Sequence, residues 1–401
     1  MPTKQNKFAF IVPRFGESIA GGAETLVAKL ALNLAKRGDD ITILTTCAKD
    51  NRTWNNDFPE ADATEYGLKV KRFLVDDRNL DTWIPLQIKV SEGMILPIEE
   101  QLNWMQESVN SLAMYEYIYN NQNNFDYFFF APYLFGTTFW GSLICPEKTI
   151  LIPCLHNEYY AYTEVLQSMF RQVKGFLFNA EPEKELAESL YGNLLGGEVG
   201  MGFVEPEINQ INQLKPYFKD NFDYILYVGR KETGKNLHIL IENFIKFKDS
   251  ISGFDNLKLV IAGGGSFSDV GSNNLLNRND LIDLSQVSEE EKLRLIKYSK
   301  VLCQPSTNES FSIVIMEAWQ LEVPVLVHSD CAVTKRHCID SGGGLYFKDS
   351  ADFNLVIQEI LNNPKLAQKL GSSGKHYVKT KYSWDAVIKR FDEVMEEVKS
   401  L

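Results

Sequence analysis

The segment Phe8-Ala-Phe-Ile-Val-Pro13 predicts a buried strand near the start of the chain. A glycine-containing loop follows it, and Ala23–Arg37 then carries apolar side chains at helical spacing. Gly38 ends this predicted helix after two basic residues, which suit the negative end of the helix dipole. Ile41-Thr-Ile-Leu-Thr45 predicts the next strand. A strand, a helix and a second strand in this order indicate a parallel α/β sheet.

The same pattern begins again in the second half of the chain. Tyr224–Val228 predicts a strand, Leu237–Phe247 a helix, and Leu257–Ala262 a strand that runs into three glycines beginning at Gly263. The chain has 401 residues, which is too long for one ordinary core. We therefore expect an α/β protein with two domains, each built on a parallel sheet. A ligand cleft is expected between the carboxyl ends of their strands.

The run Val199-Gly-Met-Gly-Phe203 indicates the border between the two domains. We place the N-terminal domain at residues 1–204 and the C-terminal domain at residues 205–382. Trp384–Val398 has an amphipathic pattern and predicts a terminal helix. Residues 50–100 are less regular and are interpreted as a region that holds insertions.

Composition and charge exclude some classes of function. The net charge is -12 and no Lys/Arg-rich block interrupts it, which argues against a nucleic-acid-binding protein. Six cysteines without a CxxC pair predict a reduced, cytoplasmic protein without a zinc site. Met1–Lys7 is polar, so no signal peptide is expected. Tyr127–Cys145 has 19 uncharged residues, but its proline and glycines favour a strand, a turn and a core helix over a membrane span.

Two loops have the composition of anion-binding sites. Gly21 and Gly22 lie between the first strand and its helix, where backbone N–H groups and the helix dipole favour a phosphate. A tight turn explains a glycine pair equally well. The second loop, Gly229-Arg-Lys-Glu-Thr-Gly-Lys235, nearly matches the P-loop pattern GxxxxGK[ST]. Asn236 stands where a hydroxyl would coordinate magnesium, which makes a P-loop NTPase the weaker alternative.

The basic side chains of the second loop suggest another ligand. Arg230 and Lys235 are predicted to converge on a diphosphate, Arg as a bidentate fork and Lys as a point charge. A solvated basic loop is the alternative. The chain contains no Asp-x-Asp pair of the kind that often holds a divalent metal against a diphosphate. We therefore expect fixed cations and helix dipoles to replace a metal ion, with no metal and no cofactor required.

The stretch Glu309-Ser-Phe-Ser-Ile-Val-Ile-Met-Glu317 places two carboxylates eight positions apart. It follows Val301–Ser306, which predicts a buried strand and a turn. The first carboxylate is expected in a loop, and the second about two helical turns further along the same face. Two fixed carboxylates suit a ligand with two hydroxyl-bearing parts, such as a sugar and a ribose. A capped surface helix with two solvated glutamates is the alternative.

In their order and separation, these motifs resemble the GT4-type family (glycosyltransferase group 1) of retaining glycosyltransferases with the GT-B fold. The resemblance covers nearly the whole chain. It is carried by Gly21-Gly-Ala-Glu24, Gly229-Arg230 with Lys235, Glu309–Glu317 and Trp384. It implies two Rossmann-like domains, an N-terminal one for the acceptor and a C-terminal one for a nucleotide sugar. It also implies a final helix, 383–401, that crosses back to the N-terminal domain.

The resemblance implies transfer of a sugar from a nucleoside-diphosphate donor to an acceptor hydroxyl, in polysaccharide or glycoconjugate biosynthesis. The acceptor would be a glycan or a lipid-linked glycan, so the protein would be cytoplasmic with at most peripheral membrane contact. The implied catalytic residues are His156, Arg230, Lys235 and Glu309. The implied donor-binding residues are Gly21, Gly22, Arg230, Lys235, Gly263, Glu309, Phe311, Ser312, Ile313 and Glu317.

Within these sets, Glu309 would bind the donor sugar and Glu317 the ribose. His156 follows a predicted strand and would line the reaction centre, although a lone histidine is more often structural. Tyr133 and Phe135 are acceptor candidates, with core packing as the favoured alternative for both.

The chain departs from the family pattern at several positions. Ser310 and Ser312 stand where the family commonly has Glu-Gly-Phe-Gly, Glu322 replaces a usual glycine, and Asn179-Ala180 replaces a frequent serine. Three alternatives to a glycosyltransferase remain: a non-catalytic GT-B partner subunit, a GT-B sugar-nucleotide epimerase and a P-loop NTPase.

Overall fold

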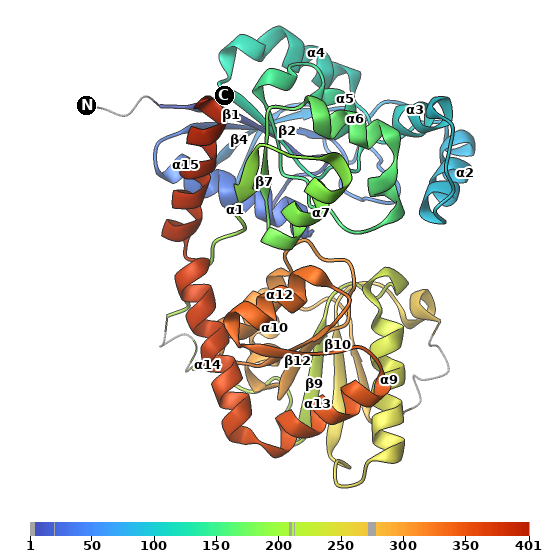
Figure 1. The fold of residues 1–401 in the computed structure, drawn as a ribbon, viewed down its shortest axis with the longest axis vertical. Helices are drawn as coiled ribbons and strands as arrows, with labels where there is room; N and C mark the ends of the chain where they lie inside the picture. Colours follow the sequence, from blue (N-terminus) through green and yellow to red (C-terminus); the bar gives the residue numbers. More distant parts are fainter. Residues whose placement is uncertain (1–4, 20, 208–210, 212, 272–277, 401) are drawn as a thin grey trace. The chain divides into compact units, whose positions relative to one another are not determined.

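The structure is a computed structural model that describes residues 5–19, 21–207, 211, 213–271 and 278–400. It divides into two compact units (Figure 1). The N-terminal unit consists of Met1–Gly202 and Trp384–Leu401, and the C-terminal unit of Phe203–Ser383. Ala20 of the glycine loop lies outside the described residues, and each unit is treated by itself below.

The N-terminal unit is built on an eight-stranded sheet with the order β3-β4-β2-β1-β5-β6-β7-β8. The strands are β1 (Lys7–Ile11), β2 (Asp40–Thr46), β3 (Asp62–Glu65), β4 (Leu68–Phe73), β5 (Tyr127–Phe130), β6 (Thr149–Leu151), β7 (Gly175–Phe178) and β8 (Gly196–Glu198). All neighbours pair in parallel except β3 and β4. The predicted strand-helix-strand start is confirmed, with β1 at the centre of a doubly wound sheet.

Helices cover both faces of this sheet (Figure 1). They are α1 (Gly22–Lys36), α2 (Leu80–Ser91), α3 (Ile98–Gln106), α4 (Leu112–Asn121), α5 (Gly136–Ser142), α6 (Glu164–Gln172), α7 (Glu181–Tyr191) and α15 (Trp384–Ser400). Ala9 and Ile11 of β1 face the core beneath α2–α7, and the alternate residues Phe8 and Phe10 face the side of α1 and α15. Because helices cover both faces of the sheet, β1 contains consecutive apolar residues instead of alternating apolar and polar ones.

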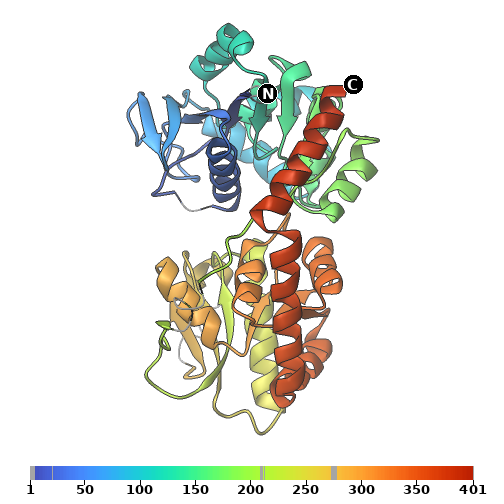
Figure 2. The ribbon, with the colours of Figure 1, turned by 90° about the vertical axis from the view of Figure 1, so that its left-hand side faces the viewer.

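The C-terminal helix belongs to the N-terminal unit, as the family resemblance implied (Figure 2). Phe391 of α15 packs against Phe8 and Phe129, with ring centroids 6.2 and 5.9 Å apart. The Arg37 guanidinium lies over the Phe391 ring at 5.2 Å and pairs with Asp392 at 2.6 Å. The helix therefore completes one face of the N-terminal core.

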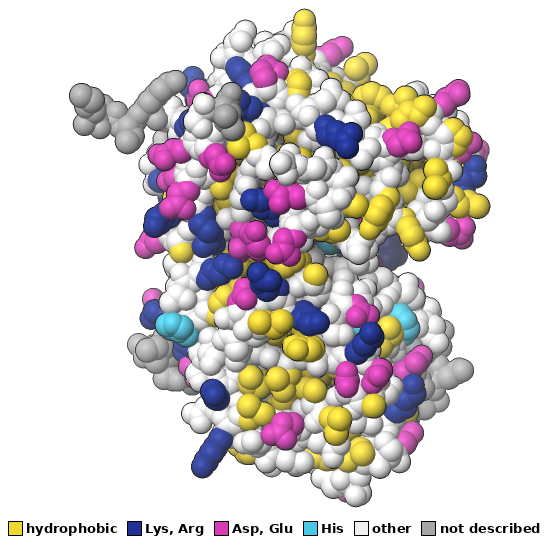
Figure 3. All heavy atoms as spheres, in the orientation of Figure 1, with side chains coloured by type: hydrophobic (Ala, Val, Ile, Leu, Met, Phe, Trp, Pro, Cys, Tyr) yellow, Lys and Arg dark blue, Asp and Glu magenta, His cyan; other side chains and the backbone are white. Residues whose placement is uncertain are grey.

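Residues 50–100, whose sequence pattern is less regular, contain regular secondary structure. They form the β3–β4 hairpin and the helices α2 and α3. The sequence pattern hid these elements because β3 is buried on neither face and α2 contains Pro85 and exposes Ile84 and Ile88. Exposed apolar side chains, including Ile95 in the α2–α3 connection, gather over this part of the unit (Figure 3).

The C-terminal unit is built on a six-stranded parallel sheet with the order β11-β10-β9-β12-β13-β14. Its strands are β9 (Asp223–Val228), β10 (Leu257–Ala262), β11 (Leu281–Leu284), β12 (Val301–Gln304), β13 (Val325–His328) and β14 (Gly344–Phe347). Its helices are α9 (Leu237–Ser250), α10 (Glu289–Tyr298), α11 (Ile313–Gln320), α12 (Ala332–Ser341), α13 (Ser350–Asn362) and α14 (Pro364–Lys381). The core packs α9 and α13 against one face of the sheet, and α10, α11 and α12 lie on the other (Figure 1).

The uncharged stretch Tyr127–Cys145 is divided between strand β5 and helix α5, as predicted. Within the described part of the chain, no helix has both the length and the apolar character needed to cross a membrane. All six cysteines are described, none of them forms a disulfide bond, and five of them are buried.

We expect Phe391→Ala to lower the free energy of unfolding of the N-terminal unit by about 3–5 kcal/mol, because it empties a buried aromatic site between α15 and the sheet. Differential scanning calorimetry would measure the shift. Lys389→Ala on the same helix removes an exposed side chain and should change the stability by no more than about 0.5 kcal/mol. An unchanged transition in Phe391→Ala would contradict the assigned packing.

Candidate active site

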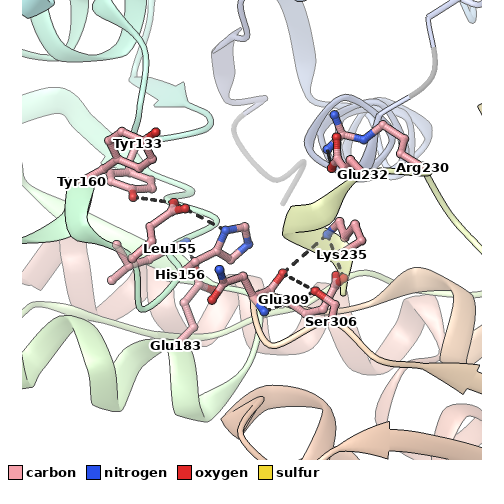
Figure 4. Close-up of polar contacts among 12 residues, drawn as sticks. Tyr133, Leu155, His156, Tyr160, Glu183, Arg230, Glu232, Lys235, Ser306 and Glu309 are labelled. Carbon is pink, nitrogen blue, oxygen red and sulfur yellow. Dashed lines mark hydrogen bonds and ion pairs between the residues drawn. The ribbon is translucent and has the colours of Figure 1, made fainter. Parts of the chain in front are cut away.

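The predicted cationic loop of the C-terminal unit follows β9, and its side chains have separate partners (Figure 4). Lys235 Nζ donates a hydrogen bond to Glu309 Oε1 at 2.8 Å, and both side chains are largely buried. Arg230 is 62% exposed and pairs with Glu232 at 3.1 Å. The structure thus brings Lys235 to Glu309, while Figure 4 shows the Arg230 guanidinium directed toward Glu232.

Asn236, the residue that breaks the P-loop pattern, links two strand-end loops. Its side-chain amide lies 3.3 Å from both Pro305 O and Thr307 Oγ1, in the loop after β12. Its backbone is left-handed, with φ of 54°, a conformation that Asn tolerates better than most residues. The amide therefore holds the Glu309 loop against the Lys235 loop, a role that the sequence did not reveal.

The expectation that Glu309 lies in a loop is confirmed, but the stretch between it and Glu317 is not two turns of continuous helix. Helix α11 begins only at Ile313, so Glu309 lies in the preceding loop and Glu317 on the helix. The interruption is Ser312, whose φ of 69° is incompatible with a continuous helix. Glu317 pairs with Lys292 of α10 at 2.8 Å. The alternative of two solvated glutamates is not supported, because the two side chains are only 12% and 17% exposed.

The side chains between the two glutamates point mainly into the protein. Phe311 is buried and packs against Phe203, Tyr382 and His337. Its ring therefore anchors the loop, and a donor would meet the backbone here. The Ser312 hydroxyl is buried without a hydrogen-bond partner, and Ile313 is partly buried at the first position of α11.

Gly263 allows the loops after β9 and β10 to touch. A Cβ atom at this position would lie 2.0 Å from Gly229 O, and its φ of 141° disfavours any side chain. The neighbouring Lys231 N–H donates to Gly264 O at 2.7 Å. The Lys231 ammonium group is buried and held by Asp283 at 2.7 Å, so it fixes the base of the cationic loop. The sequence reasoning missed Lys231.

The glycine loop of the N-terminal unit is already occupied by side chains of the same unit. Gly21 caps α1, and Gly22 is the first helical residue. A Cβ atom on Gly21 would lie 2.0 Å from the Glu24 carboxylate, which pairs with Arg14. Arg14 also donates to Lys49 O at 3.0 Å. A phosphate at these amides would compete with Glu24, a partner that the glycine motif alone did not show.

His156 lies in the loop after β6 (Figure 4). Its Nδ1 atom is 3.6 Å from Glu158 Oε1, and the side chain is 27% exposed. Tyr133 donates a hydrogen bond to the same oxygen at 2.9 Å. Burial and the neighbouring Glu158 raise the pKa of Tyr133 well above its ordinary value, so it remains a neutral donor.

The aromatic acceptor candidates pack inside the N-terminal unit. Tyr133 is buried and presents only its hydroxyl group to Glu158. Phe135 packs edge-on against Trp54, with ring centroids 5.1 Å apart. The core alternative therefore describes both rings better than a stacking surface for a sugar.

A buried carboxyl group, Glu183 of α7, accepts backbone hydrogen bonds from Leu155 and Asn179, each at 2.6 Å. Burial raises the pKa of Glu183 to about 8, against the opposing effect of these hydrogen bonds. Acidic residues are common in the first turn of any helix, so no sequence pattern distinguishes Glu183 from them. Among the residues that the structure places, no group of three His, Cys, Asp or Glu side chains could hold a metal ion.

Comparisons with known proteins agree with this architecture. Residues 209–377 match the family model described as glycosyl transferases group 1. An uncharacterized glycosyltransferase of Methanocaldococcus jannaschii is 29% identical over 176 residues, which are 43% of this chain and 44% of that protein. The capsular polysaccharide biosynthesis glycosyltransferase CapM of Staphylococcus aureus is 25% identical over 222 residues, 50% of this chain and 55% of CapM. The chain thus spans about half the length of the curated relatives it matches.

The solved structures extend the likeness to the whole chain. The Anabaena HepE structure in complex with UDP and glucose has a TM-score of 0.70 at 14% identity and covers 99% of this chain and 100% of HepE. The family match lies within the C-terminal unit and agrees with the resemblance stated above. The chain as a whole has the GT-B fold, so the predicted fold class is confirmed.

We expect Gly263→Ala to lower the free energy of unfolding of the C-terminal unit by about 1–3 kcal/mol, because the new methyl group would overlap the Gly229 carbonyl. Gly264→Ala is the matched control, since a Cβ atom there meets open space. Urea unfolding of the two variants would measure the difference. Equal stability of both variants would remove the close approach assigned to Gly263.

We expect Ser312→Gly to stabilise the C-terminal unit by about 1 kcal/mol. It relieves a left-handed backbone and removes a buried hydroxyl without a partner. Ser310→Gly, in the same loop but without a positive φ, should instead destabilise the unit by about 0.5–1 kcal/mol. Thermal unfolding would record the two opposite shifts, and a loss of stability in Ser312→Gly would argue against strain at this residue.

Proposed function

We propose that the protein is a retaining glycosyltransferase that moves a sugar from a nucleoside-diphosphate sugar to an acceptor hydroxyl. The observation that carries this proposal is the pair of Lys235 and Glu309, 2.8 Å apart at the carboxyl edge of the C-terminal sheet. A cation suits the diphosphate of the donor, and an adjacent carboxylate suits sugar hydroxyl groups. The edge where parallel strands end is also where open α/β sheets bind ligands.

The proposed chemistry places cations where charge develops. Cleavage of the bond between the anomeric carbon and the diphosphate oxygen leaves negative charge on the diphosphate. Lys235 and Arg230 would stabilise that charge more strongly in the transition state than in the ground state. Arg230 is exposed and its pair with Glu232 is solvated, so the guanidinium can exchange this partner for a phosphate at little cost.

The two glutamates would hold the hydroxyl-bearing parts of the donor. Glu309 is proposed to accept hydrogen bonds from the donor sugar and Glu317 from the ribose. Their partners Lys235 and Lys292 hold both carboxylates in place before the donor arrives. The departing phosphate would accept the proton of the acceptor hydroxyl, so the proposal needs no separate general base and no metal ion.

The acceptor is proposed to bind the N-terminal unit, where His156 would line the reaction centre. A glycan or lipid-linked glycan acceptor in polysaccharide biosynthesis is supported by the likeness to CapM. The exposed apolar side chains of α2 and of the α2–α3 connection, among them Ile84, Ile88 and Ile95, are compatible with a lipid-linked acceptor and peripheral membrane contact.

The alternatives explain fewer of these contacts. A P-loop NTPase would need a hydroxyl at position 236, but the Asn236 amide faces the next loop. A non-catalytic partner subunit has no use for buried ion pairs at both glutamates. A GT-B sugar-nucleotide epimerase would use the same nucleotide sugar but would transfer no sugar to an acceptor. Analysis of the reaction products would distinguish it from a glycosyltransferase.

Calorimetric titration of UDP, GDP, ADP, dTDP and ATP, each with and without EDTA, tests the proposal. We expect one nucleoside diphosphate to bind with the same affinity in EDTA, because Arg230 and Lys235 supply the charge. UDP is the first ligand to try because HepE was solved with UDP. Binding of ATP alone, and only with magnesium, would overturn the proposal in favour of the P-loop.

Variants assign the roles within the site. Lys235→Ala should weaken diphosphate binding by about 10-fold or more, since it removes a charged hydrogen-bond donor. Glu309→Gln should leave diphosphate binding within about twofold while sugar transfer falls at least about 100-fold. Lys300→Ala, which removes the partner of Asp223 at the opposite end of β9, is the control for a loss of surface charge. Unchanged turnover in Glu309→Gln would contradict the mechanism.

A further inference from the structure

The residues around His156 belong to neither a strand nor a regular helix, so something else must fix their conformation. β6 ends at Leu151, and the next element is the short 3-10 helix Tyr159–Tyr162. A loop residue that acts in a reaction has to be held close to its working position, because misplacement by about 1 Å costs about 100-fold in rate. The supports of this loop are therefore as relevant to function as the imidazole itself.

One support is the buried carboxyl group of Glu183. Its Oε1 atom accepts the Leu155 N–H, directly before His156, and its Oε2 atom accepts the Asn179 N–H after β7. β6 and β7 are parallel neighbours in the sheet. A single side chain at the start of α7 thus ties together the loops that leave two adjacent strands.

The geometry suggests a specific role rather than general stability. Burying a carboxyl group is unfavourable unless both oxygens are hydrogen-bonded. Glu183 is 1% exposed and meets this condition through backbone groups, which an apolar residue of similar size could not bond. A side chain that lacks an acceptor on either branch would leave one of these two backbone N–H groups without its partner.

A second support acts on the imidazole ring. Glu158 Oε1 lies 3.6 Å from His156 Nδ1 and accepts the Tyr133 hydroxyl at 2.9 Å. Since Tyr133 is buried in the core, it gives Glu158 a fixed anchor. The ring is thereby oriented with Nδ1 toward the carboxylate, which leaves Nε2 for other partners.

We propose that Glu183 and Glu158 are positioning residues for His156, Glu183 through the backbone and Glu158 through the ring. The catalytic consequence rests on the proposed function, whereas the positioning itself does not. Neither residue needs to touch the donor or the acceptor.

The five histidines provide a direct readout that is independent of turnover. His156 is the only one in the N-terminal unit, because the other four, at 238, 328, 337 and 376, belong to the C-terminal unit. Imidazole resonances in a carbon–proton correlation spectrum would report both units at once. His156→Asn assigns the signal by its disappearance.

The test variant is Glu183→Gln, which replaces one acceptor oxygen by an NH2 group facing a backbone N–H. Glu185→Gln, on an exposed position of the same helix, is the matched control. We expect the His156 signal to shift or broaden in Glu183→Gln, with the other four unchanged and all five unchanged in Glu185→Gln. An unmoved His156 signal in Glu183→Gln would overturn the role of Glu183. Glu158→Gln should also move only the His156 signal, and an unmoved signal there would overturn the role of Glu158.

The rate of sugar transfer is a separate measurement on the same variants. Glu183→Gln should lower kcat by about 10- to 100-fold while the affinity for the nucleoside diphosphate, which binds the other unit, stays within about twofold. General destabilisation of the protein would instead reduce both the fraction that binds the nucleoside diphosphate and the fraction that transfers sugar. If the wild-type protein transfers no sugar but the His156 signal moves as expected, the proposed function fails and the positioning stands.

A measurement on the wild-type protein covers the case in which Glu183→Gln does not fold. The Leu155 and Asn179 amides lie outside the named strands and helices, so without Glu183 they would lack these acceptors. We expect both to exchange about 10- to 100-fold more slowly with deuterium than the exposed Asn157 amide in the same loop. Exchange at the Asn157 rate would show that the two hydrogen bonds do not persist and would overturn the proposal.

Discussion

The parallel register of the two sheets is the constraint on which the candidate site depends. When neighbouring strands run in one direction, every loop that follows a strand leaves from the same edge of the sheet. In the C-terminal unit this gathers Arg230, Lys235, Gly263 and Glu309, which follow β9, β10 and β12. In the N-terminal unit it gathers the glycine loop and His156 after β1 and β6. Residues far apart in sequence thus meet without any motif that spans them.

Ion pairing is the second constraint, because charged groups at these edges are largely shielded from water. Glu309, Glu317 and Lys231 each have a partner of opposite charge within 2.8 Å. Removing one partner from such a pair leaves an uncompensated buried charge. This destabilises a protein far more than replacing both partners by apolar residues. A ligand must therefore replace each contact that it displaces. A diphosphate can do so for Lys235 and sugar hydroxyls can do so for Glu309, whereas an uncharged apolar ligand can do neither.

Local patterns in the sequence were sufficient for the central strands, the helices that follow β1 and β9, and the fold class, because apolar runs and helical spacing are properties of neighbouring residues. They were not sufficient for residues whose role depends on distant partners. Asn236 looked like a defect in a P-loop, but its partners are 69 and 71 positions away. Glu183 looked like an ordinary acidic residue of a helix start, but it bonds Leu155, 28 positions away. The exact start of α11 could not be predicted for the same reason, since Ser312 is held left-handed by its surroundings rather than by its own preference.

At Ser312 and Glu322 the backbone has a conformation that is typical of glycine, although neither residue is glycine. Both stand where the family commonly has glycine, and both have positive φ angles, 69° and 60°. A non-glycine residue in this region costs about 1–2 kcal/mol, and it persists only where the surroundings determine the conformation. Buried Phe311 fixes the chain beside Ser312, and Glu322 pairs with Lys375 at 2.7 Å. The left-handed backbone conformation at these residues is therefore imposed by the contacts around them. The serine hydroxyl is where the chain departs from the family pattern that it resembles, and burial leaves that hydroxyl without a hydrogen-bond partner.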